Sequence, residues 1–115
     1  MADFSVTIRE AEPVTIVELQ GYLDAHTAAD LENVFTEFIE NNKFQIVVNF
    51  KNLIYISSAG LGVFMAYVET MREHNGDIKF AAMTKSVFGI FDLLGFPLLY
   101  EFFDDESAAI KKFIA

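Results

Sequence analysis

The chain has 115 residues, the length of one ordinary domain, and 53% of them are hydrophobic, with 13 Phe and no Trp. This apolar content excludes an intrinsically disordered chain, which combines low hydrophobicity with high charge. The 8 basic against 17 acidic residues leave a net charge of −9, which repels nucleic acids and anionic membranes, and the lack of Cys excludes disulfides and zinc–thiolate sites.

Two strands open the predicted fold. Phe4, Val6 and Ile8 alternate with polar residues, which is typical of a strand with one exposed face. Residues 14–20 predict a second strand, and the turn at Pro13 makes it the hairpin partner of the first. We therefore expect an antiparallel pair at the start of the chain.

The clearest helix is predicted over residues 27–41. Its apolar residues recur at helical spacing and form one stripe, made by Leu31, Val34, Phe35, Phe38 and Ile39. Thr27 is the expected N-cap, with Asp30 three residues later in a weak form of the capping box.

A buried strand follows this helix. Residues 45–50 contain an uninterrupted β-branched run at 46–48, which indicates a strand covered on both faces, as in a parallel sheet. Residues 51–57 are expected to form a short connection to the next helix.

The second helix is predicted over residues 59–74, and 75–76 (Asn-Gly) supply its end. Its expected core stripe is made by Leu61, Phe64, Met65, Val68 and Met71. Val63, Ala66 and Tyr67 lie beside this stripe. They either contact a neighbouring helix or form an apolar patch for a partner.

The last third of the chain predicts a strand at 77–82, a helix at 85–94 and a short strand at 98–102. The acidic residues 104–106 favour the start of a terminal helix rather than a cation site, because acids complement the helix dipole. The side chains expected to face inward from this helix are Ile110, Phe113 and Ile114.

The predicted order of elements is β-β-α-β-α-β-α-(β)-α. Strands that alternate with helices favour parallel pairing through right-handed crossovers, and the opening hairpin adds one antiparallel strand. We therefore expect an α/β fold, with a mixed sheet of four to five strands and about four helices, in one domain over residues 1–115.

The sequence lacks the common catalytic and metal-binding motifs. His26 and His74 have no partner at the spacing of a helical zinc pair, and Gly60 and Gly62 do not complete a phosphate-binding loop. Ser58 is not in a G-x-S-x-G elbow. A small enzyme that uses Ser58 as nucleophile, with His26 as base, is one alternative, but we expect no enzyme, no metal and no cofactor.

The segment from Ser57 to Gly62 is the most informative. Two serines lie where the second helix begins, and the glycines at 60 and 62 leave the backbone of its first turn uncovered by side chains. Backbone N–H groups and the positive end of the helix dipole would tolerate a phosphate on a hydroxyl there. The alternative is structural, with a serine as the N-cap and glycine allowing the helix to approach the sheet.

Residues 55–63 (Tyr-Ile-Ser-Ser-Ala-Gly-Leu-Gly-Val) resemble the signature of the STAS domain, the fold of bacterial anti-sigma factor antagonists. The resemblance covers the whole chain, since four further segments match the family in order and spacing. These are Gly21 to Asp24, Thr27 to Leu31, the group Val87, Phe91, Leu94 and Gly95, and the acidic start of the last helix over 102–109.

The resemblance implies a regulator of sigma-factor-dependent transcription that works by partner switching. The expected partner is an anti-sigma factor that is also a serine kinase with a GHKL-type ATP site. It would phosphorylate Ser58 and release the domain, and a serine phosphatase would reset it. The residues expected to contact the partner are Asp24, Ser57, Ser58, Ala59, Gly60, Leu61, Gly62, Val63 and Tyr67.

Ser57 departs from the family pattern, in which Asp frequently precedes the acceptor. An acidic neighbour would orient the acceptor hydroxyl or contact a basic group on the kinase, and serine in its place leaves Ser57 as a second candidate acceptor. Asp24 follows a predicted strand, so it should lie at the same end of the sheet as Ser58, unless it serves only an Asx turn. The family alternative is a STAS subunit of a larger sensory or transport assembly, without phosphorylation.

The expected location is the cytoplasm. The chain begins without a charged segment followed by an apolar one, as a signal peptide would require. The longest apolar run, residues 59–68, is too short to cross a bilayer, so no membrane insertion is expected. The acidic charge argues against direct binding of nucleic acid.

Overall fold

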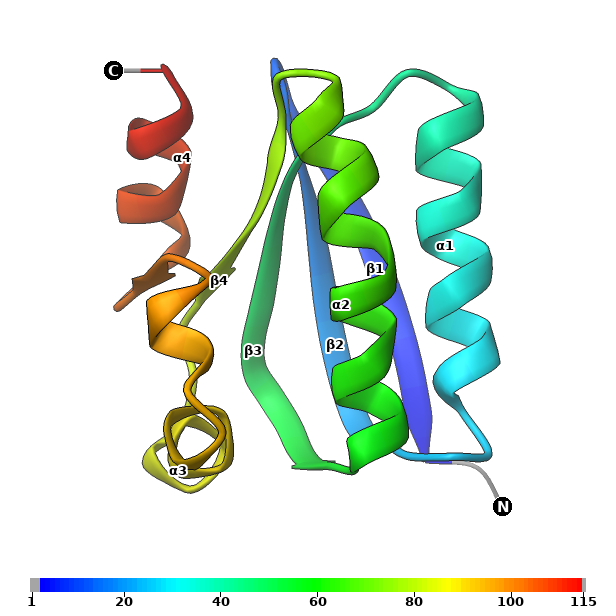
Figure 1. The fold of residues 1–115 in the computed structure, drawn as a ribbon, viewed down its shortest axis with the longest axis vertical. Helices are drawn as coiled ribbons and strands as arrows, with labels where there is room; N and C mark the ends of the chain where they lie inside the picture. Colours follow the sequence, from blue (N-terminus) through cyan, green and yellow to red (C-terminus); the bar gives the residue numbers. More distant parts are fainter. Residues whose placement is uncertain (1–2, 115) are drawn as a thin grey trace.

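The computed structural model describes residues 3–114. Its elements in chain order are β1 (Phe4–Ala11), β2 (Val14–Leu23), α1 (Ala28–Glu40), β3 (Gln45–Ile56), α2 (Ser58–Glu73), β4 (Asp77–Ala81), α3 (Lys85–Leu93), the short 3₁₀ helix η1 (Phe96–Leu98), β5 (Phe102–Phe103) and α4 (Glu106–Ile114). The strands form one five-stranded sheet in the order β1-β2-β3-β4-β5 (Figure 1). The predicted α/β fold class, with its mixed sheet, is confirmed.

The pairing of the strands fixes where the chain turns. β1 runs antiparallel to β2, from Phe4 opposite Gly21 to Ala11 opposite Val14, whereas the other three pairs are parallel. Parallel strands end at the same edge of a sheet. The ends of β2 and β3 therefore lie together, at the lower edge in Figure 1, where α2 begins.

The two faces of the sheet are covered by different helices. Side chains alternate along β2, so that Val17 and Leu19 pack with α1 and α2, whereas Val14 and Ile16 pack beneath α4. Figure 1 shows α1 and α2 side by side across the first face. Because α4 is short, part of the second face stays uncovered.

Phenylalanine rings form the centre of the larger core. Phe80 of β4 contacts the rings of Phe50, Phe64 and Phe91 with centroids 5.1–5.3 Å apart, mostly in edge-to-face geometry. Tyr100 stacks on Phe80 at 4.9 Å, and burial raises the pKa of Tyr100 to about 12. This cluster joins β3, β4, α2 and α3 and accounts for the high Phe content.

β3 is longer than predicted, because the expected connection at 51–57 continues the strand to Ile56. The additional residues pair with β2, from Gln20 opposite Asn52 to Leu23 opposite Ile56, across two shifts of register. The irregular register leaves Ile54 and Tyr55 both exposed. A strand without strict alternation is not recognised by its period.

The predicted strand at 98–102 is wrong in its position. Gly95, with a φ of 78°, and Pro97 direct the chain into η1, and β5 consists of Phe102–Phe103 alone. β4 ends at Ala81, one residue before the predicted end, because Ala82 adopts a φ of 62°.

Three side chains are not where the sequence predicts them. Met65 and Ile114 are exposed rather than inward, and Val63 is buried rather than beside the core stripe. α2 packs against α1 as well as the sheet, and Tyr67 lies on Phe35 of α1 with ring centroids 5.5 Å apart. The buried face of α2 is therefore rotated toward Val63 and away from Met65.

We predict that Leu31→Ala or Phe35→Ala lowers the free energy of unfolding by about 2–5 kcal/mol, because each removes a side chain with no exposed surface. Urea unfolding followed by circular dichroism measures the loss. Glu32→Ala on the exposed face of α1 is the control and should change stability by less than about 0.5 kcal/mol. A near-neutral Phe35→Ala would contradict the packing of α1 described above.

Candidate functional site

The start of α2 is anchored to the ends of two parallel strands. Leu23 ends β2 opposite Ile56, and the Ser57 N–H donates a hydrogen bond to the Leu23 carbonyl at 2.9 Å. The Ser57 hydroxyl is the N-cap, since it accepts a long hydrogen bond of 3.5 Å from the Gly60 N–H. Of the two serines, Ser57 therefore has the structural role that the sequence left unassigned.

Ser58 is the first residue of α2 and is exposed, as is Ala59. The first backbone N–H groups of a helix have no partner within the helix, and its dipole is positive at this end. A phosphate on the Ser58 hydroxyl would therefore sit in a favourable electrostatic environment at the surface. A modifying enzyme can reach this hydroxyl without unfolding the domain.

The two glycines of the segment serve different purposes. A Cβ on Gly60 would lie 2.7 Å from Leu23 Cγ and 3.0 Å from Ile56 Cγ1, so Gly60 allows α2 to approach the strand ends. A Cβ on Gly62 would meet no atom within 4 Å. Packing within the domain thus explains the glycine at position 60 but not the one at position 62. Gly62 leaves the exposed side of the first turns without a side chain.

The loop before α1 lies at the same edge of the sheet. Asp24 directly follows β2, and its carboxylate accepts a hydrogen bond from the His26 N–H at 2.9 Å, which forms an Asx turn. Thr27 is buried and makes no side-chain cap for α1, contrary to the predicted capping box. Its hydroxyl instead donates to the Tyr22 carbonyl and accepts from the Asp24 N–H, which fixes the loop beside α2.

The structure places the nine residues of the predicted partner surface at three depths. Ser58, Ala59 and Gly62 are exposed, Asp24, Ser57 and Tyr67 are partly buried, and Gly60, Leu61 and Val63 are buried. The Tyr67 hydroxyl hydrogen-bonds Thr36 of α1 at 3.1 Å. The buried members and Tyr67 hold α2 in place, so among these nine residues only those of the first turn and Asp24 have side chains that a partner could contact.

Sequence reasoning missed three exposed apolar side chains near this edge. Tyr22 of β2 lies opposite Tyr55 of β3 in the sheet, and their ring centroids are 6.5 Å apart. Ile54, the residue before Tyr55, is exposed as well. Their exposure depends on the irregular end of β3. A longer predicted strand over residues 51–57 is the only signal that would have located them.

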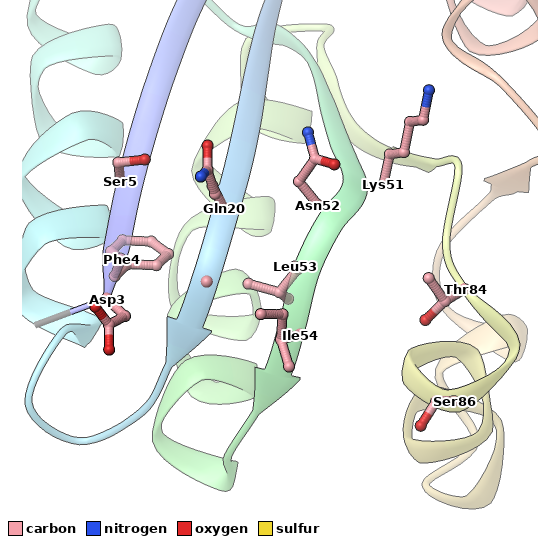
Figure 2. A pocket seen from close by; sticks show the side chains of 11 residues that line it. Asp3, Phe4, Ser5, Gln20, Lys51, Asn52, Leu53, Ile54, Thr84 and Ser86 are labelled. Carbon is pink, nitrogen blue, oxygen red and sulfur yellow. The ribbon is translucent and has the colours of Figure 1, made fainter.

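A hollow of about 940 Å³ lies on the second face of the sheet, away from Ser58. Figure 2 shows that Gln20, Asn52 and Ile54 of β2 and β3 line it together with Thr84 and Ser86 at the start of α3. Its lining is mainly amide, hydroxyl and apolar groups. The hollow and the first turn of α2 are therefore separate features on opposite faces.

The backbone N–H of His26 is hydrogen-bonded to the Asp24 carboxylate, within the loop before α1. Across residues 3–114, no helix combines the length and the apolar character needed to span a membrane.

We predict opposite effects of alanine at the two glycines. Gly60→Ala should lower the free energy of unfolding by about 1–3 kcal/mol, because the buried Leu23 and Ile56 side chains must shift. Gly62→Ala should raise it by up to about 1 kcal/mol, since alanine is the better helix former and fits without contact. Thermal unfolding of both variants tests this, and a destabilised Gly62→Ala would contradict the open position.

The sequence and the fold of the chain are similar to those of known proteins. The model of the STAS domain family matches residues 5–109. The anti-sigma F factor antagonist of Paenibacillus polymyxa is 29% identical over 100 residues, which cover 86% of each chain. An anti-sigma factor antagonist from Mycobacterium paratuberculosis has the same fold, with a TM-score of 0.89 at 17% identity over 97% of this chain and 95% of that one. The phosphorylated form of the Bacillus cell fate determinant SpoIIAA superposes with a TM-score of 0.74 at 17% identity over 94% of this chain and 98% of that one. The chain belongs to the STAS domain family.

Proposed function

We propose that the protein is an anti-sigma factor antagonist that binds an anti-sigma factor through the first turn of α2, and that phosphorylation of Ser58 ends the binding. The observation that carries this proposal is the exposed Ser58 hydroxyl on a bare helix N-terminus, directly before Ala59-Gly60-Leu61. The relative from Paenibacillus polymyxa is an anti-sigma F factor antagonist, and SpoIIAA exists in a phosphorylated form. Both support the same role for this chain.

The switch follows from electrostatics. A phosphoserine carries about −1.5 to −2 charges at pH 7. An interface that accepts a neutral hydroxyl must desolvate this dianion without a partner for it, which costs several kcal/mol. A loss of about 3 kcal/mol weakens binding more than a hundredfold. No refolding of the antagonist is needed.

The partners that fit this role are an anti-sigma factor with serine kinase activity, of the GHKL type in the family, and a serine phosphatase that resets the switch. The net charge of −9 favours a partner with a basic surface. We infer no catalytic activity for the chain itself and a cytoplasmic location, where sigma factors act. Binding would free the sigma factor from the anti-sigma factor.

We predict that Ser58→Ala binds the anti-sigma factor as wild type does but is no longer released by ATP. Its stability should barely change, because Ser57 and not Ser58 caps α2. Ser58→Glu should weaken binding, though less than phosphate, since it adds one charge and lacks the third oxygen. Isothermal titration calorimetry measures both affinities, and mass spectrometry locates the phosphate.

The matched control for these variants is Thr70→Glu, which adds the same charge to a polar residue near the other end of α2. Weakening by Ser58→Glu but not by Thr70→Glu would assign the effect to the position rather than to net charge. Phosphate on Ser57 with Ser58 unmodified would refute the acceptor assignment. Wild-type affinity in Ser58→Glu would place the partner surface elsewhere and favour a STAS subunit that is not phosphorylated.

We predict that Ser57→Asp keeps partner affinity and raises the rate of Ser58 phosphorylation. Asp caps a helix about as well as Ser, so the fold should be unchanged. The carboxylate would also present a hydrogen-bond acceptor beside the Ser58 hydroxyl and a charge to a basic kinase surface. Single-turnover phosphate transfer from ATP measures the rate. A slower rate at an unchanged melting temperature would show that the kinase of this protein is adapted to serine at position 57.

A further inference from the structure

The most exposed apolar side chains of the domain lie where α3 leads into η1. Leu93 is 85% exposed and Leu98 is 89% exposed, and Leu94 and Leu99 are each more than half exposed. Four exposed leucines within seven residues of sequence are unusual, because soluble monomers rarely expose large contiguous apolar patches and such patches often bind a partner. We name Met65, Leu93, Leu94, Leu98 and Leu99 together the leucine ridge.

The backbone beneath the leucine ridge is held firmly. Phe96 is buried, meets Phe91 edge-to-face with ring centroids 5.1 Å apart, and stacks on Tyr100 at 5.2 Å. Arg72 of α2 donates a hydrogen bond to the Leu99 carbonyl at 2.7 Å and lies 5.4 Å from the centre of the Tyr100 ring. The leucines are therefore presented by a fixed turn attached to α2, rather than by a loose segment.

The leucine ridge lies on the same face of the sheet as α2. α3 begins at the hollow on the second face, where Figure 2 shows Thr84 and Ser86, and its chain continues to Leu99, which Arg72 holds from the first face. Figure 1 shows α3 end-on at the edge of the sheet where α2 starts. The segment that follows α3 thus reaches α2 at Arg72.

One side of α2 leads from Ser58 toward the leucine ridge. Ser58, Met65 and Arg72 are each seven residues apart, which is about two turns, or about 10 Å, so they share one side of the helix. Arg72 reaches Leu99 on this side. Met65 is 56% exposed and lies between Ser58 and Arg72, so an exposed apolar side chain stands between the first turn and the contact with Leu99.

We propose that the leucine ridge is the second half of the anti-sigma factor's binding site and supplies most of its affinity, while Ser58 at one end supplies the switch. This inference rests on the proposed function. The occupant is an apolar patch of the anti-sigma factor bordered by basic side chains, because Glu69 of α2 and Asp92 of α3 are exposed beside the ridge and the domain carries a net charge of −9. A phosphate on Ser58 would then disrupt one end of a larger interface, without covering the leucines.

The test is calorimetric titration with the purified anti-sigma factor of the same bacterium, in ADP so that Ser58 stays unmodified. Leu93→Ser combined with Leu98→Ser should weaken binding at least about tenfold, as expected for central apolar contacts. Met65→Ser should weaken binding as well. Ile114→Ser on α4 is the matched control, because Ile114 is 58% exposed against 56% for Met65, and should leave the affinity unchanged.

The outcomes separate the two proposals. If wild type binds no anti-sigma factor, the proposed function fails and this inference fails with it. If wild type binds and the double variant binds equally well, the inference alone is overturned. The inference is also overturned if the double variant keeps its affinity but loses a concentration-dependent dimer seen by analytical ultracentrifugation, because the ridge would then bind a second copy of the chain. Melting temperatures within a few degrees of wild type confirm that the variants fold.

Discussion

The parallel pairing of β2 with β3, carried through to Leu23 opposite Ile56, is the constraint on which the candidate site depends. It brings the Asp24 loop and the start of α2 to one edge of the sheet. Gly60 then lets α2 approach these strand ends more closely than any side chain would allow. Since the Ser57 N–H is bonded to the Leu23 carbonyl, the position of Ser58 follows from the sheet.

The sequence predicted the order of elements and the buried faces well where the pattern was regular. The stripe containing Leu31 and Phe35 is such a case, because a helix packed on one sheet face has one apolar side. The end of β3 was not predictable, since two register shifts interrupt its alternation. Met65 was misplaced for a different reason. A helix in contact with both a sheet and a neighbouring helix has a broad buried face, and only the packing of α1 decides where that face ends.

The candidate site was likewise predictable from the sequence only in part. The sequence located the segment from Ser57 to Gly62 but could not separate its structural members from its exposed ones. Both serines suit the start of a helix, and only the hydrogen bond from Gly60 identifies Ser57 as the cap. Both glycines leave the first turn bare, yet only Gly60 is required by a close contact. The leucine ridge was not found because its residues come from α2 and from the segment around α3 and η1, which are far apart in sequence and are joined by the contact of Arg72 with Leu99.

The position of Ser58 also determines what kind of switch phosphorylation can be. At a helix N-terminus, a negative group stabilises the helix by about 0.3–1 kcal/mol, so phosphate should not loosen the fold of the free antagonist. The same group costs several kcal/mol where a partner must desolvate it. The two effects act on different states, the free domain and the complex. Under the proposed function, phosphorylation at this position would therefore weaken the complex while leaving a folded domain with its apolar surface intact, and removal of the phosphate would restore binding without a folding step.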